Sequence, residues 1–239
     1  MTAHFAHSFA KVARSQAAPT AKTTCREATV RDLIGPKRAW PQTIVPMKNL
    51  LFLKGFLKNW REVGSPVPSS RHVAKKICKL IDFSRIRSLV ELGPGTGVIT
   101  QEILRSLQAD ARLIVFEVNK DYCDELRSSP DSRLTIHNVS AFRIHTVLRE
   151  RVDCVVSGIP IATLSKAEFS RFYAAVTEVL EPGGVFIQIQ LSPQYYGTLK
   201  HFFREVRIDF TCRNTPPAFV YRCRWPATGA LHQDLVSAA

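Results

Sequence analysis

The sequence predicts a doubly wound α/β fold with a mostly parallel sheet of the seven-stranded type, preceded by an amphipathic helix. From residue 88 onward, short apolar runs typical of buried parallel strands alternate with helical patterns. A loop with glycines at alternate positions joins the first apolar run to a helix within Leu89–Thr100. The last two strand patterns, 206–211 and 218–224, are close in the chain and indicate an antiparallel edge.

Composition limits the class of protein. The 239 residues are enough for one large domain with a short extension. No apolar run reaches about eighteen residues, so we predict no transmembrane helix. The six cysteines include no C-x-x-C pair and no zinc spacing, which predicts free thiols in a reducing compartment and no metal site.

The net charge of +13 lies wholly in the first part of the chain. Residues 1–90 contain 17 Lys and Arg against 4 Asp and Glu, whereas residues 91–239 contain 16 of each. A basic N-terminal third on a neutral body indicates an anionic partner, either nucleic acid or anionic lipid. The alternative is a charge bias that only increases solubility.

Residues 1–46 differ from the rest of the chain. They have weak hydrophobic periodicity and no acid before Glu27, so we expect a disordered basic extension. An acid-poor, basic start is typical of an organellar transit peptide. The alternatives are a translated upstream region that ends before Met47, and a functional tail.

Residues 48–60 predict a basic amphipathic helix. At 3.6 residues per turn, its apolar residues share one face: Leu50, Leu53, Phe56, Leu57 and Trp60. Its lysines lie outside or at the margin of that face: Lys48, Lys54 and Lys58. A helix of this kind with a terminal Trp is typical of a membrane interface, where lysine stems follow apolar surface. A helix packed on the protein core is the alternative.

The remaining elements follow in order. Ser69 or Ser70 should cap a helix over 71–81, which completes an N-terminal helical segment, 47–87. The strand patterns are 88–91, 112–117, 133–137, 152–157 and 185–191; the helical patterns are 96–107, 120–128, 166–180 and 199–206. Residues 227–239 should form a loose tail.

The glycine loop and two acids predict the ligand. The loop has the pattern E-x-G-x-G-x-G, formed by Glu91, Gly93, Gly95 and Gly97; the dinucleotide pattern would need a third glycine at the position of Val98. A carboxylate at this place would repel a pyrophosphate, but it suits a ligand with an ammonium group. Glu117 follows at the end of the second strand, where an acid commonly binds a ribose. Together these features indicate S-adenosylmethionine, with a ligand-free glycine turn as the alternative.

The loop and its acids resemble the class I methyltransferase family, which has a Rossmann-like fold. Further segments are similar to the bacterial phospholipid N-methyltransferases, which themselves resemble ribosomal RNA adenine dimethylases. The matching segments are 52–60, 68–71, 90–97, 116–119, 156–160 and 214–218. The resemblance implies that residues 88–226 form an S-adenosylmethionine-binding catalytic domain. It also implies N-methylation of phosphatidylethanolamine by a cytoplasmic enzyme bound peripherally to an anionic membrane surface through residues 48–60.

The resemblance also suggests further site residues. The loop after the fourth strand should face the methyl group, with Ser157 or the Gly158 carbonyl region orienting the amine, Pro160 in the same loop, and Ser157 also near the cofactor. At the end of the third strand, family members often have an Asp that holds the adenine amino group. This chain has Asn138 and Ser140 there, and both side chains can form hydrogen bonds.

Several alternatives remain open at this stage. Adenine dimethylases stack the target base on an aromatic residue after the fourth strand, where this chain has Ile161, which argues against a nucleic-acid substrate. An RNA adenine N6-methyltransferase, a small-amine methyltransferase and a non-catalytic binding protein are the competing hypotheses. Tyr195 and Tyr196 are candidates for lining a headgroup pocket, and no general base is identified.

Overall fold

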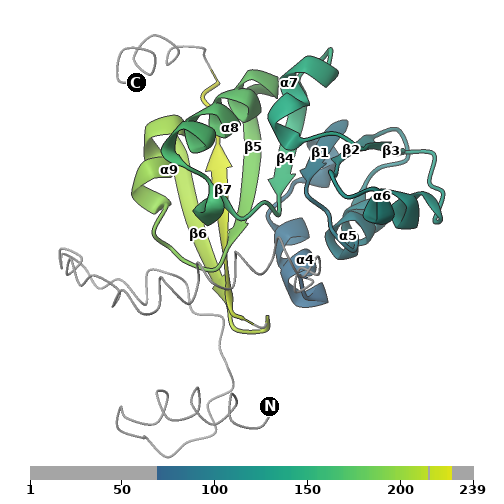
Figure 1. Ribbon diagram of the computed structural model, residues 1–239, viewed down its shortest axis with the longest axis horizontal. Helices are drawn as coiled ribbons and strands as arrows, with labels where there is room; N and C mark the ends of the chain where they lie inside the picture. The colour runs from purple at the N-terminus through teal and green to yellow at the C-terminus, as the bar shows by residue number, and fades with distance from the viewer. Residues whose placement is uncertain (1–68, 215, 228–239) are drawn as a thin grey trace, which may run out of the picture.

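The computed structural model describes residues 69–214 and 216–227 (Figure 1). The predicted extension 1–46, the amphipathic helix 48–60 and all but the first residue of the tail 227–239 lie outside the described residues. The predicted division into segments therefore stays a prediction. Within the described residues, no helix is long and apolar enough to cross a membrane.

A seven-stranded sheet in the order β3-β2-β1-β4-β5-β7-β6 forms the centre of the described structure. The strands are β1 (Ser88–Leu92), β2 (Arg112–Phe116), β3 (Leu134–His137), β4 (Val152–Ser157), β5 (Leu180–Gln190), β6 (Glu205–Thr211) and β7 (Ala218–Arg224). The first five are parallel, and β7 runs antiparallel to both β5 and β6. This arrangement confirms the predicted fold class and the antiparallel edge.

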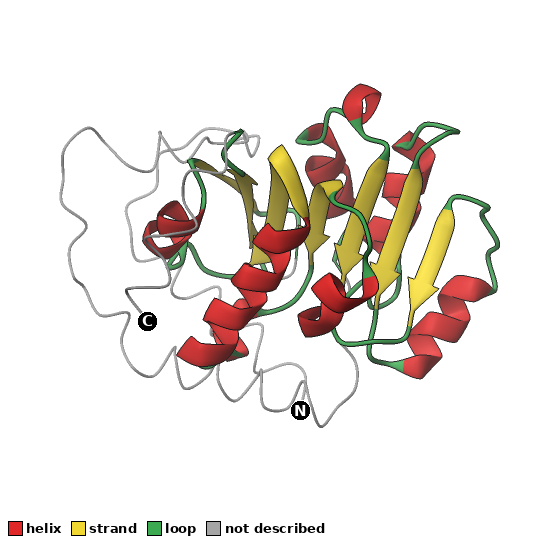
Figure 2. Cartoon of the chain, turned by 90° about the horizontal axis from the view of Figure 1, so that it is seen from above, coloured by secondary structure: helices red, strands yellow, loops and turns green. Residues whose placement is uncertain are grey.

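Helices cover both faces of this sheet (Figure 2). On one face lie α4 (Arg71–Lys79), α5 (Val98–Ser106) and α6 (Lys120–Arg127); on the other lie α7 (Ile144–Val147), α8 (Lys166–Val179) and α9 (Tyr196–Phe202). Short 3-10 turns occur at Phe83–Arg85, Ala141–Arg143 and Ile161–Thr163. Two apolar clusters, one beneath each helix layer, form the core.

Side-chain caps fix where several helices begin. The Ser70 hydroxyl accepts a hydrogen bond from Val73 N at 3.3 Å, so Ser70 and not Ser69 is the N-cap of α4. Ser165 and Glu168 form a reciprocal capping box at the start of α8. The Asn119 side chain accepts a hydrogen bond from Asp121 N at 2.8 Å at the start of α6.

The same start of α4 is tied to the loop between β6 and β7. Asn214 Oδ1 accepts a hydrogen bond from Ser70 N at 2.9 Å, and the Ser70 hydroxyl donates to Arg213 O at 2.8 Å. Ser70 and Asn214, which belong to two segments on which the family resemblance rested, are thus in contact although they are far apart in the sequence.

Two elements have boundaries that differ from the prediction by three residues or more. Helix α9 covers Tyr196–Phe202 and not 199–206, because Val206 is needed in β6, where it pairs with Cys223. Strand β5 begins at Leu180, ahead of the expected Val185. The extra residues form an irregularity in the ladder, where the register with β4 shifts and Gly183 takes φ +80°.

Candidate active site

The predicted site residues lie at one edge of the sheet, where the parallel strands end. His137, Phe116, Leu92, Ser157 and Gln188 form one continuous row across β3, β2, β1, β4 and β5. The glycine loop follows β1, Glu117 follows β2, Asn138 follows β3 and Gly158 follows β4. The chain reverses its strand order between β1 and β4, which is where doubly wound folds bind their ligands.

The glycine loop needs glycine for two separate reasons. Gly93, Gly95 and Gly97 take φ of +68°, +55° and +75°, a region that residues with a Cβ rarely adopt. At Gly97, the N-cap of α5, an added Cβ would also lie 2.5 Å from Leu126 Cδ2 of α6. The loop is anchored to β2 because Gly93 N donates to Phe116 O at 2.9 Å. The result is a tight turn that leads into the N-terminus of α5.

Glu91 lies inside the fold and not on the open surface. Its side chain is 1% exposed, and Oε2 accepts a hydrogen bond from the Thr100 hydroxyl of α5 at 2.7 Å. Oε1 is buried and has no hydrogen-bond partner in the described part of the chain. Burial, the largest cause, and the neighbouring Glu117 together raise the pKa of this carboxyl to about 7, against the Thr100 hydrogen bond, which lowers it. One carboxylate oxygen therefore lacks the partner that a buried acceptor normally has.

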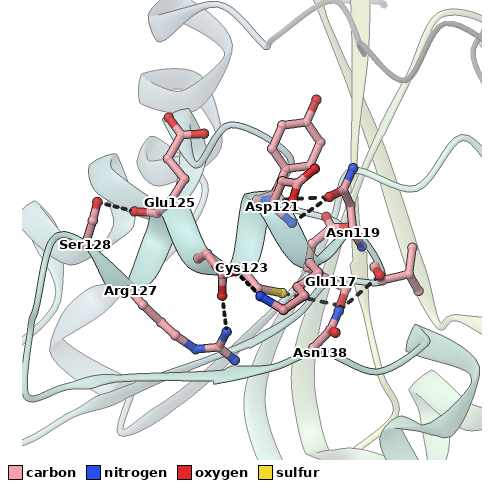
Figure 3. Close-up of polar contacts among 12 residues, drawn as sticks. Glu117, Asn119, Asp121, Cys123, Glu125, Arg127, Ser128 and Asn138 are labelled. Atoms are coloured by element: carbon pink, nitrogen blue, oxygen red, sulfur yellow. Dashed lines mark hydrogen bonds and ion pairs between the residues drawn. The ribbon is translucent and has the colours of Figure 1, made fainter.

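Glu117 connects the second strand to the glycine loop. Its Oε2 accepts a hydrogen bond from Gly95 N at 3.3 Å, and its Oε1 accepts one from Asn119 N at 2.9 Å. Figure 3 shows Asn138 beside the backbone of Glu117: its amide donates to the main-chain carbonyls of Glu117 at 2.9 Å and of Val118 at 3.0 Å. Asn138 therefore braces the turn that presents Glu117.

Ser140 caps the 3-10 turn Ala141–Arg143. Its hydroxyl accepts a hydrogen bond from Phe142 N at 3.4 Å, and the residue is half-buried. Ser140 and Asn138 thus both take part in local backbone contacts beyond β3. Their predicted contacts with the adenine remain predictions.

The loop after β4 lies directly against the glycine loop. Gly158 N donates to Leu92 O at 2.9 Å, and a Cβ on Gly158 would meet Gly93 O at 2.8 Å. Ser157 is fully buried, and its hydroxyl accepts a hydrogen bond from Ile159 N at 3.3 Å. Pro160 caps the following 3-10 turn, and Thr163 N donates to its carbonyl at 3.0 Å. Ser157, Gly158 and Pro160 thus shape a compact loop at the predicted position, and their role with the substrate amine stays a prediction.

Two glutamines of β5, which the sequence did not single out, belong to this region. Gln188 and Gln190 are buried, and both side chains donate to the carbonyl of Ile159. Their signal in the sequence is a pair of amides at alternate positions of an otherwise apolar strand, at its carboxyl end. Alternation of this kind is also what a strand with one solvated face shows.

The two tyrosines considered for a headgroup pocket have different surroundings. Tyr195 stacks on Phe169 of α8, with ring centroids 5.8 Å apart. Tyr196 is half-buried, and the Lys200 ammonium lies 4.6 Å from its ring centroid. Ile161, at the position of the dimethylase aromatic, is fully buried in the core cluster with α8.

The donor set fits S-adenosylmethionine. This cofactor carries an ammonium and a sulfonium charge, which two acids at one sheet edge can balance, and two ribose hydroxyls, which an acid after β2 can bind. The glycine turn leaves the backbone open to close approach. No group of three or more potential metal-ligating side chains occurs among the described residues. The cysteines of the described residues are free: Cys78, Cys123, Cys154, Cys212 and Cys223.

Comparison with known proteins agrees with this assignment. Residues 89–184 match the family model described as "Methyltransferase domain". The chain is 35% identical over 181 residues to the ornithine lipid N-methyltransferase of Singulisphaera acidiphila, covering 73% of this chain and 94% of that protein. It is 39% identical over 59 residues to ribosomal RNA small subunit methyltransferase A of Vibrio cholerae, covering 24% of this chain and 21% of that protein.

A solved structure has the same fold. The N-methyltransferase NodS from Bradyrhizobium japonicum WM9, in complex with S-adenosyl-L-homocysteine, superposes with a TM-score of 0.55 at 15% identity, covering 70% of this chain and 91% of that one. At this identity the likeness concerns the fold. The Singulisphaera relative, matched over nearly its whole length, shows the family. The chain therefore belongs to the class I S-adenosylmethionine-dependent methyltransferase family and is an N-methyltransferase that uses S-adenosylmethionine.

Proposed function

We propose that this enzyme N-methylates the headgroup amine of a membrane lipid, with phosphatidylethanolamine as the substrate. One observation carries the proposal: a relative that matches over 94% of its own length is an ornithine lipid N-methyltransferase. Ornithine lipid is therefore the alternative acceptor. Both molecules offer a primary amine on a lipid, so the two hypotheses share one chemistry.

The β4 exit loop supports an amine over a flat base. Ile161 is fully buried in the core, so its side chain offers no platform on which a base could stack. The preceding loop, 157–160, is small and close to the glycine loop. A compact amine carried on a flexible headgroup fits beside such a loop without base flipping.

The roles of the site residues follow from this proposal. When bound, the cofactor supplies a methyl group on a positively charged sulfur, which is already activated for transfer. Glu117 would hold the ribose, and Glu91 would balance the positive charge near the glycine loop. The loop formed by Ser157, Gly158 and Pro160 would align the amine nitrogen with the methyl carbon, a task that accounts for much of the rate enhancement in such a transfer.

Residues 48–60 lie outside the described residues, and we propose that they bind an anionic membrane surface. Their basic amphipathic pattern supports this role. Helix α4 continues the basic character, since it carries Arg71, Lys75, Lys76 and Lys79 on one short element. We accordingly propose a cytoplasmic enzyme that is peripherally bound to the membrane.

RNA adenine methylation is the second candidate. The match to ribosomal RNA small subunit methyltransferase A favours it. That match covers only about a fifth of the RNA enzyme. The buried Ile161, which cannot stack on a base, argues against RNA adenine methylation.

The test is methyl transfer from radiolabelled S-adenosylmethionine in parallel reactions. The acceptors are vesicles with phosphatidylethanolamine, vesicles with ornithine lipid, vesicles of phosphatidylglycerol alone, and ribosomal RNA. We expect label in the phosphatidylethanolamine fraction. Label in ornithine lipid alone would show that ornithine lipid, and not phosphatidylethanolamine, is the substrate. Label in RNA alone would overturn the lipid proposal.

A further inference from the structure

The carbonyl of Ile159 receives hydrogen bonds from two glutamine side chains. Gln188 Nε2 donates to it at 2.9 Å and Gln190 Nε2 donates at 3.1 Å. A carbonyl oxygen has two lone pairs, so these two donors occupy both. Ile159 lies in the loop between Gly158 and Pro160, which follows β4 at the methyl-transfer edge.

Gln188 donates to the Ile159 carbonyl although its own amide oxygen has no hydrogen-bond partner among the described residues. Its side chain is 0% exposed, and Nε2 also lies 3.1 Å from Ser157 O and 3.0 Å from Ile189 O, so its two N–H groups are shared among three carbonyl oxygens. Its Oε1 is buried with no partner among the described residues. Leaving a buried amide oxygen unpaired is unfavourable, and such groups in native proteins usually have a functional reason. The side chain is oriented to donate to the loop carbonyls and not to satisfy its own oxygen.

The position of this contact makes it relevant to the reaction. Gln188 is in register with Ser157, in the same row as the residues that precede the glycine loop and Glu117. Gly158, next to Ile159, packs against the backbone of Gly93. If the substrate is an amine, as proposed above, the backbone oxygens of this loop are candidate acceptors for its N–H groups.

Free acceptors at such a place would limit repeated methylation. Each transfer replaces one N–H of the amine with a methyl group. A buried carbonyl that pairs with an N–H of the primary amine would be left unpaired when the amine returns methylated, and that loss is unfavourable. A carbonyl that is already paired with protein donors loses no hydrogen bond in either case, so it does not favour the primary amine over the methylated one.

We propose that Gln188 and Gln190 are positioning residues that set how many methyl groups the enzyme adds. By occupying the Ile159 carbonyl, they withhold it from the substrate, so that the site accepts amines that have already been methylated. This inference rests on the proposed function, because it requires a lipid amine as the acceptor. Because the Ile159 carbonyl forms no hydrogen bond with the substrate, the site does not discriminate between a primary amine and a methylated one.

The test compares three acceptors with the full-length enzyme: phosphatidylethanolamine, its N-methyl derivative and its N,N-dimethyl derivative. The main variant is Gln190→Leu, which removes one donor by replacing the amide with an apolar side chain of similar size. The matched control is Gln101→Leu, an exposed residue on α5. The measurements are kcat/KM for each acceptor, together with cofactor affinity by calorimetry as a check on the fold.

We expect wild type and Gln101→Leu to use all three acceptors with similar kcat/KM. In Gln190→Leu, kcat/KM for the dimethyl acceptor should fall about tenfold relative to the primary amine, the factor expected for one buried acceptor left unpaired. Gln188→Met should change the same ratio at least as much, because it removes donors to both Ser157 O and Ile159 O.

Equal losses for all three acceptors in both variants would overturn the proposal, since a merely structural role predicts them. A wild-type enzyme that stops after one methyl group would also overturn it. If wild type methylates no lipid amine at all, the proposed function fails instead, and the two failures are thereby distinguished. Should Gln190→Leu lose cofactor binding, Gln190→Met provides the same comparison with an unbranched side chain.

Discussion

Replacing Glu91 with Gln tests the electrostatics of the cofactor site. The substitution keeps the shape of the side chain and an oxygen that can accept from the Thr100 hydroxyl, which lies 2.7 Å from Oε2. It removes the negative charge of a carboxylate that is 1% exposed and has one unpaired oxygen. The structure therefore predicts opposite effects on stability and on cofactor binding.

The effect on stability follows from the pKa of Glu91, which burial raises from the ordinary 4.5 to about 7. Below pH 4.5 the carboxyl is protonated in the folded and unfolded states and contributes no pH dependence. Between these two values the unfolded state is ionised and the folded state stays protonated, so the free energy of unfolding falls as the pH rises. From pH 5 to pH 8 this one group should cost the wild type about 2.5 kcal/mol.

The Gln variant has no such titration. Its own amide hydrogens add a cost that does not depend on pH, so the useful quantity is the change of the difference between variant and wild type. We expect the variant to gain about 2.5 kcal/mol on the wild type between pH 5 and pH 8. Urea denaturation at the two pH values, without cofactor, measures this directly.

Cofactor binding should respond in the opposite direction. A cationic ligand favours the ionised carboxylate, so S-adenosylmethionine should bind the wild type more tightly as the pH rises through 7, with release of a proton. The variant should bind more weakly at pH 8 and show no proton release from this site. Calorimetry in two buffers of different ionisation enthalpy counts the protons. Equal pH slopes of stability in variant and wild type would refute the assignment of the raised pKa to Glu91.

Three further predictions concern other parts of the chain. Glu117→Ala should raise the Kd for S-adenosylmethionine at least about tenfold, because the proposed charge-assisted hydrogen bonds to the ribose would be lost; unchanged affinity by calorimetry with an intact thermal transition would contradict the ribose assignment. Gly97→Ala should destabilise the fold by about 1–3 kcal/mol, since the residue has φ +75° and its Cβ would lie 2.5 Å from Leu126 Cδ2; urea denaturation measures this, and a Leu126→Ala background should reduce the loss. Replacing Lys48, Lys54 and Lys58 together with Glu should abolish sedimentation with anionic vesicles; a triple variant that still sediments would reject the membrane role of residues 48–60.

Much of the site was predictable because it follows from strand ends. Once Leu89–Glu91 and Arg112–Phe116 are recognised as buried parallel strands, the residues after them must meet at one edge, and the structure confirms that Gly93 and Glu117 do. Local chemistry also fixed the caps, as with Ser70. These features depend on short segments, which the sequence encodes directly.

The glutamines could not be predicted in the same way. In the strand 185–191, Ile187 and Ile189 alternate with Gln188 and Gln190, a pattern that equally describes a strand with one face in water. Whether that polar face is covered depends on α8 and α9, whose residues belong to the same apolar cluster as Phe186 of β5 and pack there only in the complete fold. Long-range pairing also explains why α9 ends before the predicted residue: Val206 belongs to β6, where it pairs with Cys223 of β7.

The distribution of charge within the site has a consequence for the chemistry. Glu91 and Glu117 both lie on the side of β1 and β2, next to the glycine loop. The loop that follows β4 carries no ionisable side chain from Ser157 to Ser165. A carboxylate beside the substrate would stabilise its ammonium form, which has no lone pair and cannot accept a methyl group. A neutral loop allows the amine to lose its proton more easily as it leaves water. In the proposed site, two acids serve a cationic cofactor and a separate uncharged loop receives the amine, an arrangement that suits methyl transfer to nitrogen.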